Sequence, residues 1–150
     1  MSQLSVQEAL DRLTEMVALV LDVPVVCLSL ITGEHKLFTS SAGLATPIAL
    51  LLSHKFSRHV TAAGQLLAVG DGRADPLVAG NPAVMDGMVT AFAGAPLVSR
   101  DGHAIGTLCA MDYLPREWTD HNLKLLQQLP AFILHTVERA ASAVTKVSPR

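Results

Sequence analysis

Residues Ala91 to Leu129 read AFAGAPLVSRDGHAIGTLCAMDYLPREWTDHNLKLLQQL. Two runs of residues that favour strands, Thr90 to Val98 and Ala104 to Asp112, are separated by the turn sequence SRDGH. This pattern predicts an antiparallel hairpin, in which Gly102 supplies the positive φ of the turn. A hairpin of this length is the natural centre of a mainly antiparallel sheet.

A helix is predicted directly after the hairpin, capped by Thr119 and running to Val144. Pro130 lies inside it, and an interior proline predicts a kink, because it removes one backbone hydrogen bond. The apolar residues keep a spacing of three and four across the proline. They are Leu126, Leu129, Ile133, Val137, Ala140 and Val144.

The chain upstream of the hairpin predicts a second long helix and a central strand. Ser5 and Glu8 have capping-box spacing at the start of a helix that ends at Leu21. The uncharged run Val25 to Ile31 predicts a strand buried on both faces. Further strands are predicted at Lys36–Ser41 and Gln65–Val69, with helices at Ser53–Gly64 and from Asn81; Ala45–Leu52 stays ambiguous. Hairpin-linked strands between terminal helices predict an α+β domain.

Composition restricts the function. The 150 residues are 50% hydrophobic and 16% charged, which favours one folded domain over a disordered chain. The formal net charge of −2 leaves no basic surplus for a phosphate backbone, so no nucleic-acid partner is expected. The start MSQLSVQEAL lacks the features of a signal peptide, and the longest uncharged stretch, Leu37 to His54, is too polar to span a membrane. We therefore expect a cytoplasmic protein that does not act at a membrane.

Several motifs in the second half resemble the GAF family of sensory domains, in particular its bacterial signalling type. They are the aromatic-Ala-Gly-x-Pro-Leu strand at Phe92–Leu97, the Asp-Gly-x-x-x-Gly turn at Asp101–Gly106, the Thr-Leu-Cys-x-x-Asp strand at Thr107–Asp112, and the helix start at Pro115–Asp120. Weaker matches are KFSRHV at Lys55–Val60 and LLAVGDGRADPLVAGNPAV at Leu66–Val84.

The resemblance covers about Leu10 to Leu134. It implies one domain over residues 1–150, with a core of about 5–144. It also implies a six-stranded antiparallel sheet with the N- and C-terminal helices on one face and a ligand cavity on the other. The function implied is a small-molecule sensor in signal transduction. No sequence feature names the ligand, and no cofactor is required by the sequence.

The resemblance places a set of apolar and polar side chains around the expected cavity. Aromatic and Met residues would form its apolar wall, while His59 and Asp71 would supply polar anchors. Ordinary core packing is the alternative for each of them. The candidate ligand-binding residues are Phe38, Phe56, His59, Asp71, Met85, Met88, Phe92 and Met111.

Catalysis finds little support in the sequence. His54 and His59 are five residues apart rather than the four that a helical metal pair needs, so no metal site is predicted; haem at His59 stays an open alternative. Cys27 and Cys109 lie on predicted central strands, where packing is the simpler role. One stand-alone branch of the family reduces free methionine sulfoxide with Cys residues on loops, and neither Cys of this chain falls in such a loop. We therefore predict no catalytic residue and no enzyme, with a small redox enzyme of that type as the disfavoured alternative.

The terminal helices suggest how a signal leaves the domain. Two long apolar stripes, on Ser5–Leu21 and Thr119–Val144, predict a homodimer built on these helices. A separate effector protein would then receive the signal. A GAF scaffold that binds no ligand and only mediates protein association is the second alternative.

Overall fold

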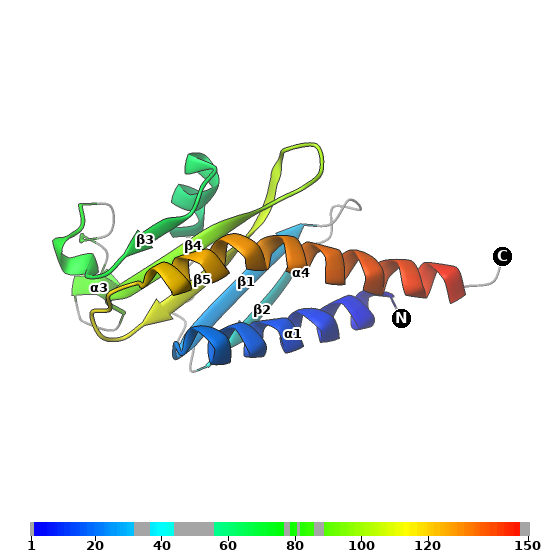
Figure 1. Cartoon of the computed structure of the whole chain (residues 1–150), viewed down its shortest axis with the longest axis horizontal. Helices are drawn as coiled ribbons and strands as arrows, with labels where there is room; N and C mark the ends of the chain where they lie inside the picture. Colours follow the sequence, from blue (N-terminus) through cyan, green and yellow to red (C-terminus); the bar gives the residue numbers. More distant parts are fainter. Residues whose placement is uncertain are drawn as a thin grey trace.

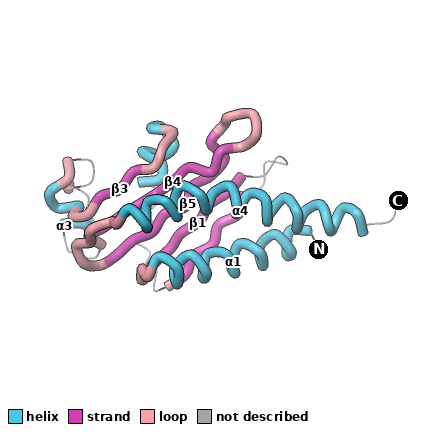
Figure 2. Tube along the Cα trace, in the orientation of Figure 1, coloured by secondary structure: helices cyan, strands magenta, loops and turns pink. Residues whose placement is uncertain are grey.

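The computed structural model describes residues 2–31, 37–43, 56–76, 79–80, 82–85 and 89–147. Two long helices lie side by side along one face of a sheet, and the start of the first and the end of the second project beyond the same side of the sheet (Figure 1). The elements are α1 (Ser2–Leu21), β1 (Val25–Ile31), β2 (Leu37–Ala42), β3 (Leu67–Val69), the 3₁₀ turn η1 (Gly72–Ala74), α3 (Pro82–Met85), β4 (Ala91–Val98), β5 (Ala104–Asp112) and α4 (Asp120–Val147). Residues 56–63 form a further helix (Figure 2).

The sheet confirms the predicted α+β class. Its strand order is β2-β1-β5-β4-β3, and the pairs of neighbouring strands are antiparallel. The described residues contain five strands, so the sixth strand that the resemblance implied is not among them. The hairpin β4–β5 has the predicted bounds to within one residue, and Gly102 in its turn has a φ of +88°. The ambiguous stretch Ala45–Leu52 lies outside the described residues.

Thr119 caps α4 as predicted. Its Oγ1 accepts a hydrogen bond from the backbone N–H of Asn122 at 3.1 Å, and its own N–H donates to Asn122 Oδ1 at 3.2 Å. Such reciprocal bonds satisfy two donors that a helix start would otherwise leave unpaired. The start of α1 differs from the prediction, because the helix already begins at Ser2 and the Ser5–Glu8 spacing lies inside it.

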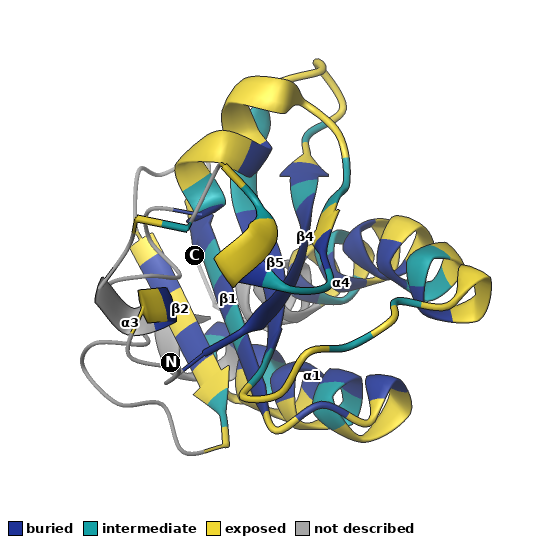
Figure 3. Cartoon of the chain, turned by 90° about the vertical axis from the view of Figure 1, so that its left-hand side faces the viewer, coloured by how far each residue is buried: buried dark blue, intermediate teal, exposed yellow. Residues whose placement is uncertain are grey.

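Two apolar clusters lie on opposite faces of the sheet. The larger lies between the sheet and the helices, and it holds the stripes of both helices, including Leu10 and Val17 from α1 and Leu126 and Ile133 from α4. The helices accordingly turn buried residues toward the sheet and exposed ones outward (Figure 3). The described parts of both stripes are thus largely covered by the sheet of the same subunit. Among the residues of these helices whose burial is described, the large apolar side chains that stay exposed are Leu19, Val20 and Phe132.

The end of α1 is fastened to the segment between β5 and α4. The Arg116 guanidinium donates to the carbonyl oxygen of Asp22 at 2.7 Å, lies 3.4 Å from the Asp112 carboxylate, and stacks 4.8 Å from the centre of the Trp118 ring. Arg116 therefore connects the end of α1 to the segment that precedes α4. Within the described residues, no helix is long and apolar enough to cross a membrane.

Candidate functional site

The sheet face opposite α1 and α4 is built from rows of side chains that the strand register brings together. One row is large and apolar: Val25, Met111, Phe92 and Val69 follow one another across β1, β5, β4 and β3. The next row holds Ser41, Cys27, Cys109 and Gly94. A third holds Thr39, Ser29 and Thr107. Successive residues of a strand alternate between faces, so these three rows share one face.

The helix at residues 56–63 packs over the apolar row and covers it. The Phe56 ring lies over Phe92 with ring centres 5.4 Å apart, and Val60 joins them in the same buried cluster. Gly94 makes this contact possible, because a Cβ there would lie 2.9 Å from Val60 Cγ2 and 3.0 Å from Phe56 Cε2. This part of the face is closed by packing.

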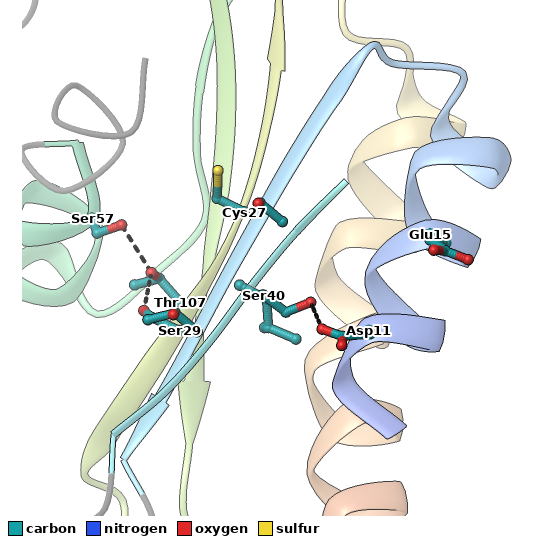
Figure 4. Close-up of a pocket in the computed structure, with 10 residues that line it drawn as sticks. Asp11, Glu15, Cys27, Ser29, Ser40, Ser57 and Thr107 are labelled. Carbon is teal, nitrogen blue, oxygen red and sulfur yellow. Dashed lines mark hydrogen bonds between the residues drawn. The ribbon is translucent and has the colours of Figure 1, made fainter. Parts of the chain in front are cut away.

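The hydroxyl row is linked to the same helix by hydrogen bonds. Thr107 Oγ1 donates to Ser57 Oγ at 2.9 Å, and it lies 3.2 Å from Ser29 Oγ (Figure 4). These hydroxyls come from β5, the helix at residues 56–63 and β1 in turn. A hydroxyl both donates and accepts hydrogen bonds, so these three linked hydroxyls can offer a ligand either a donor or an acceptor.

A cavity of about 540 Å³ opens over the thiol and hydroxyl rows on the β2 side of the sheet. Its size is within the usual range for small-molecule sites. Its floor includes Cys27, Ser29 and Thr107, with Ser57 on one side and Thr39 and Ser41 toward the edge strand. The lining side chains thus include several hydroxyls and one thiol.

The cavity also reaches around the edge strand to α1. Asp11 Oδ1 accepts from Ser40 Oγ at 2.6 Å, and Ser40 Oγ accepts from Thr14 Oγ1 at 2.9 Å. Asp11 and Ser40 lie on the α1 side of the strands in Figure 4, away from Ser29 and Thr107. Asp11 and Glu15 are the charged residues among the described lining residues.

The predicted wall residues have three different locations. Phe56, Phe92 and Met111 are buried on the expected face, but they pack against one another and do not line the cavity. Phe38 differs from the expectation, because it belongs to the cluster between the sheet and the helices. Met85 is 69% exposed, and Met88 lies outside the described residues.

The two predicted polar anchors are engaged elsewhere or exposed. His59 lies on the outer side of its helix, whose inner side carries Phe56 and Val60. Asp71 caps η1 by accepting from the backbone N–H of Arg73, and it pairs with the Arg73 side chain at 3.1 Å. The hydrogen bond from that side chain holds the pKa of Asp71 below its ordinary value. Neither residue borders the cavity.

A model of the GAF domain family matches residues 5–134 of this sequence. The chain belongs to the GAF domain family. Solved structures agree in fold. The GAF domain region of a putative membrane protein from Geobacter sulfurreducens PCA superposes with a TM-score of 0.73 at 16% identity, covering 92% of this chain and 96% of that one. A domain of a putative two-component sensor histidine kinase from Sinorhizobium meliloti 1021 gives 0.68 at 14% identity, covering 94% and 96%.

Enzymes also share this fold. The free methionine-R-sulfoxide reductase of Neisseria meningitidis, solved with its substrate, superposes on this GAF domain with a TM-score of 0.66 at 18% identity, covering 95% of this chain and 86% of that one. Identities this low show the fold alone. No curated protein matches the sequence. Among the described residues, no group of three or more His, Cys, Asp or Glu side chains is placed to hold a metal ion.

The sequence does not single out the hydroxyls that line the cavity. Ser29 belongs to none of the motifs of the resemblance, and Thr107 belongs to one, Thr107–Asp112, that does not itself indicate a ligand contact. A usable signal was present in the strand VVCLSLI, where Cys27 and Ser29 are the small residues on one face while Val26, Leu28 and Leu30 are large on the other. Small residues at alternate positions of a central strand leave space on that face.

Proposed function

We propose that this GAF domain is a cytoplasmic sensor of the bacterial signalling type that binds an uncharged polar small molecule over its hydroxyl row. One observation carries the proposal: the hydrogen-bonded hydroxyls of Ser29, Thr107 and Ser57 line the part of a cavity of about 540 Å³ that lies on the face opposite the terminal helices. Binding sites of this kind fix a ligand with a few placed polar groups. Binding rather than catalysis is the proposed role.

The chemistry of the lining favours a ligand rich in hydroxyl or amide groups. The described residues that line the cavity include several hydroxyls and carry only acidic charges, from Asp11 and Glu15 at its outer edge. An anionic ligand would meet those carboxylates unfavourably. An uncharged polar ligand can exchange its hydrogen bonds with water for bonds to Ser29, Ser57 and Thr107. The polar anchors of the proposal are thus these hydroxyls in place of His59 and Asp71.

Two physical connections would carry a binding event to the helices. Ser57 couples the helix at residues 56–63 to the floor through Thr107. Beyond that helix and β3, the backbone N–H of Arg116 donates to the Gly70 carbonyl at 2.9 Å, and Trp118 Nε1 donates to the Val69 carbonyl at 3.0 Å. Since Arg116 also holds the end of α1, a shift of the loop after β3 would reach both terminal helices.

The proposed output is a homodimer that uses the outer surface of α1 and α4. Val20 is 47% exposed and Phe132 is 50% exposed, and exposed apolar side chains on neighbouring helices favour association. A ligand that prefers one arrangement of these helices would shift the population of that arrangement and so signal to a separate effector protein.

The test removes one hydroxyl without changing side-chain shape. Wild type, Thr107→Val and Thr136→Val are each incubated with a small-molecule extract of cells of the source organism, gel-filtered, and weighed by native mass spectrometry. Thr136 is the matched control, because its hydroxyl bonds only within α4, to the Phe132 carbonyl. We expect a bound mass in wild type and Thr136→Val, and at least about tenfold lower occupancy in Thr107→Val.

Two results would contradict the proposal. Equal occupancy in Thr107→Val would place the ligand away from the hydroxyl row. A wild type that carries no bound mass at any extract concentration would favour the ligand-free scaffold instead.

A further inference from the structure

The two cysteines of the chain face each other across neighbouring strands. The register of β1 against β5 places Cys27 directly opposite Cys109. Both belong to the same face, because Cys109 is a member of the buried cluster opposite α1 and α4, and Cys27 packs against that cluster. Neither residue is in a disulfide in this structure.

Directly opposite residues of an antiparallel pair have the spacing that a disulfide nearly needs. Their Cβ atoms lie about 4.5–5.5 Å apart, whereas the Cβ atoms of a disulfide lie about 3.5–4.5 Å apart. The two ranges meet at about 4.5 Å, so the bond can form with little movement of the strands.

The two thiols differ in access. Cys27 is half-buried and lines the cavity over the thiol and hydroxyl rows. Cys109 is 1% exposed and does not line that cavity. A small reagent that enters the cavity thus meets Cys27 first. Ser41 lies opposite Cys27 on its other side, so a small polar group flanks the site toward the open edge of the sheet.

We propose that Cys27 and Cys109 form a reversible dithiol–disulfide pair that exchanges with small disulfides admitted by the cavity. The Cys27 thiolate attacks one sulfur of a small disulfide RSSR, forming a mixed disulfide and releasing one RS⁻. The Cys109 thiolate then attacks the Cys27 sulfur, forming the Cys27–Cys109 bond and releasing the second RS⁻. The two protons of the protein thiols pass to the two released thiolates. In sum, RSSR is reduced to two RSH, and the protein dithiol is oxidised to one disulfide.

The pair is a separate feature from the ligand proposal, although both use the same cavity. It requires that the cavity admit a small disulfide, and it does not require that Ser29, Ser57 and Thr107 bind any ligand. The sequence alone favours packing for both thiols, because it does not show that the strand register places them opposite each other.

The experiment uses bis(2-hydroxyethyl) disulfide, which is small and uncharged, as the probe on the folded, reduced protein, followed by intact-mass analysis and peptide mapping. Wild type is expected to lose the mass of two hydrogen atoms, to carry no adduct, and to yield a Cys27–Cys109 cross-linked peptide. Excess 2-mercaptoethanol should restore the dithiol. Cys109→Ser is expected to stop at a stable 2-mercaptoethanol adduct on Cys27, because no second thiol can displace it.

Cys27→Ser reports on access. Cys109 alone is expected to react at least about tenfold more slowly than Cys27 in the Cys109→Ser variant, since a buried thiol is reached only when the fold opens. Three results on wild type would overturn the proposal: a dithiol that persists in excess bis(2-hydroxyethyl) disulfide, a stable mixed disulfide at Cys27, or disulfides that link two chains. The wild-type measurement decides the matter even where a variant fails to fold.

Discussion

Gly106 shows how a single residue sets the floor of the cavity. It lies on β5 beside Thr107, and a Cβ at this position would collide with the backbone carbonyl oxygen of Ser29 on β1. Backbone atoms cannot yield as a flexible side chain can. The glycine therefore allows β1 and β5 to approach closely enough for Ser29 and Thr107 to share a hydrogen bond.

Replacing this glycine should destabilise the fold. Gly106→Ala is expected to lower the free energy of unfolding by about 1–3 kcal/mol, because the methyl group forces the two strands apart. Gly80→Ala is the control, since Gly80 is exposed and a Cβ there meets nothing within 4 Å; its change should stay within about 0.5 kcal/mol. Urea unfolding measures both. Equal stability of the two variants would show that β1 and β5 do not need the close approach at Gly106.

The same scale shows why candidate residues could not be chosen from the sequence. Phe92 and Met111 lie on the predicted face, but they are opposite each other in the register and beneath Phe56, so they fill space instead of lining it. Phe38 lies on the edge strand β2, where a shift of one residue in the strand would turn its side chain to the opposite face of the sheet. Alternation along a strand is readable from sequence, whereas the phase of an isolated polar strand and the pairing of distant strands are not.

At the scale of elements, the sequence predicts best where the periodicity is long or the turn chemistry is specific. The bounds of β1 and the β4–β5 hairpin agree with the prediction to within one residue, and Thr119 caps α4 as expected. The homodimer predicted from the apolar stripes stays a prediction. An apolar stripe shows that a helix is covered, but it does not show whether the sheet of its own subunit or a second subunit covers it.

Two substitutions on α4 separate these roles. Ile133 is fully buried, so Ile133→Glu should cost more than about 3 kcal/mol in the free energy of unfolding. Phe132 is 50% exposed, so Phe132→Glu should fold normally and weaken the proposed dimer. Gln127→Glu adds the same charge on the opposite flank of α4, beside the groove with β4, and should leave assembly unchanged.

Sedimentation velocity at high micromolar concentration measures assembly. A wild type that sediments as a monomer, or a Phe132→Glu variant that sediments as wild type does, would contradict the proposed interface.

At the scale of the molecule, the two faces of the sheet differ in what covers them. One face is covered by α1 and α4 and carries the main core. The other face combines a packed apolar corner with a cavity whose floor includes the Cys27 thiol and the hydroxyls of Ser29 and Thr107. The hairpin motifs indicate the family, because motifs such as Asp101–Gly106 are set by local backbone needs. The cavity is not predictable from them, because its lining comes from α1, β1, β2, β5 and the helix at residues 56–63 together.

The central claim is that a molecule bound over the hydroxyl row is felt at the terminal helices. Hydrogen exchange of wild type, with and without the extract fraction that yields the bound mass, tests it most directly. We predict slower exchange in residues 56–63 and β1, together with altered exchange at the end of α1 and the start of α4, where Arg116 joins them. Bound mass accompanied by protection confined to the cavity, with α1 and α4 unchanged, would contradict the account.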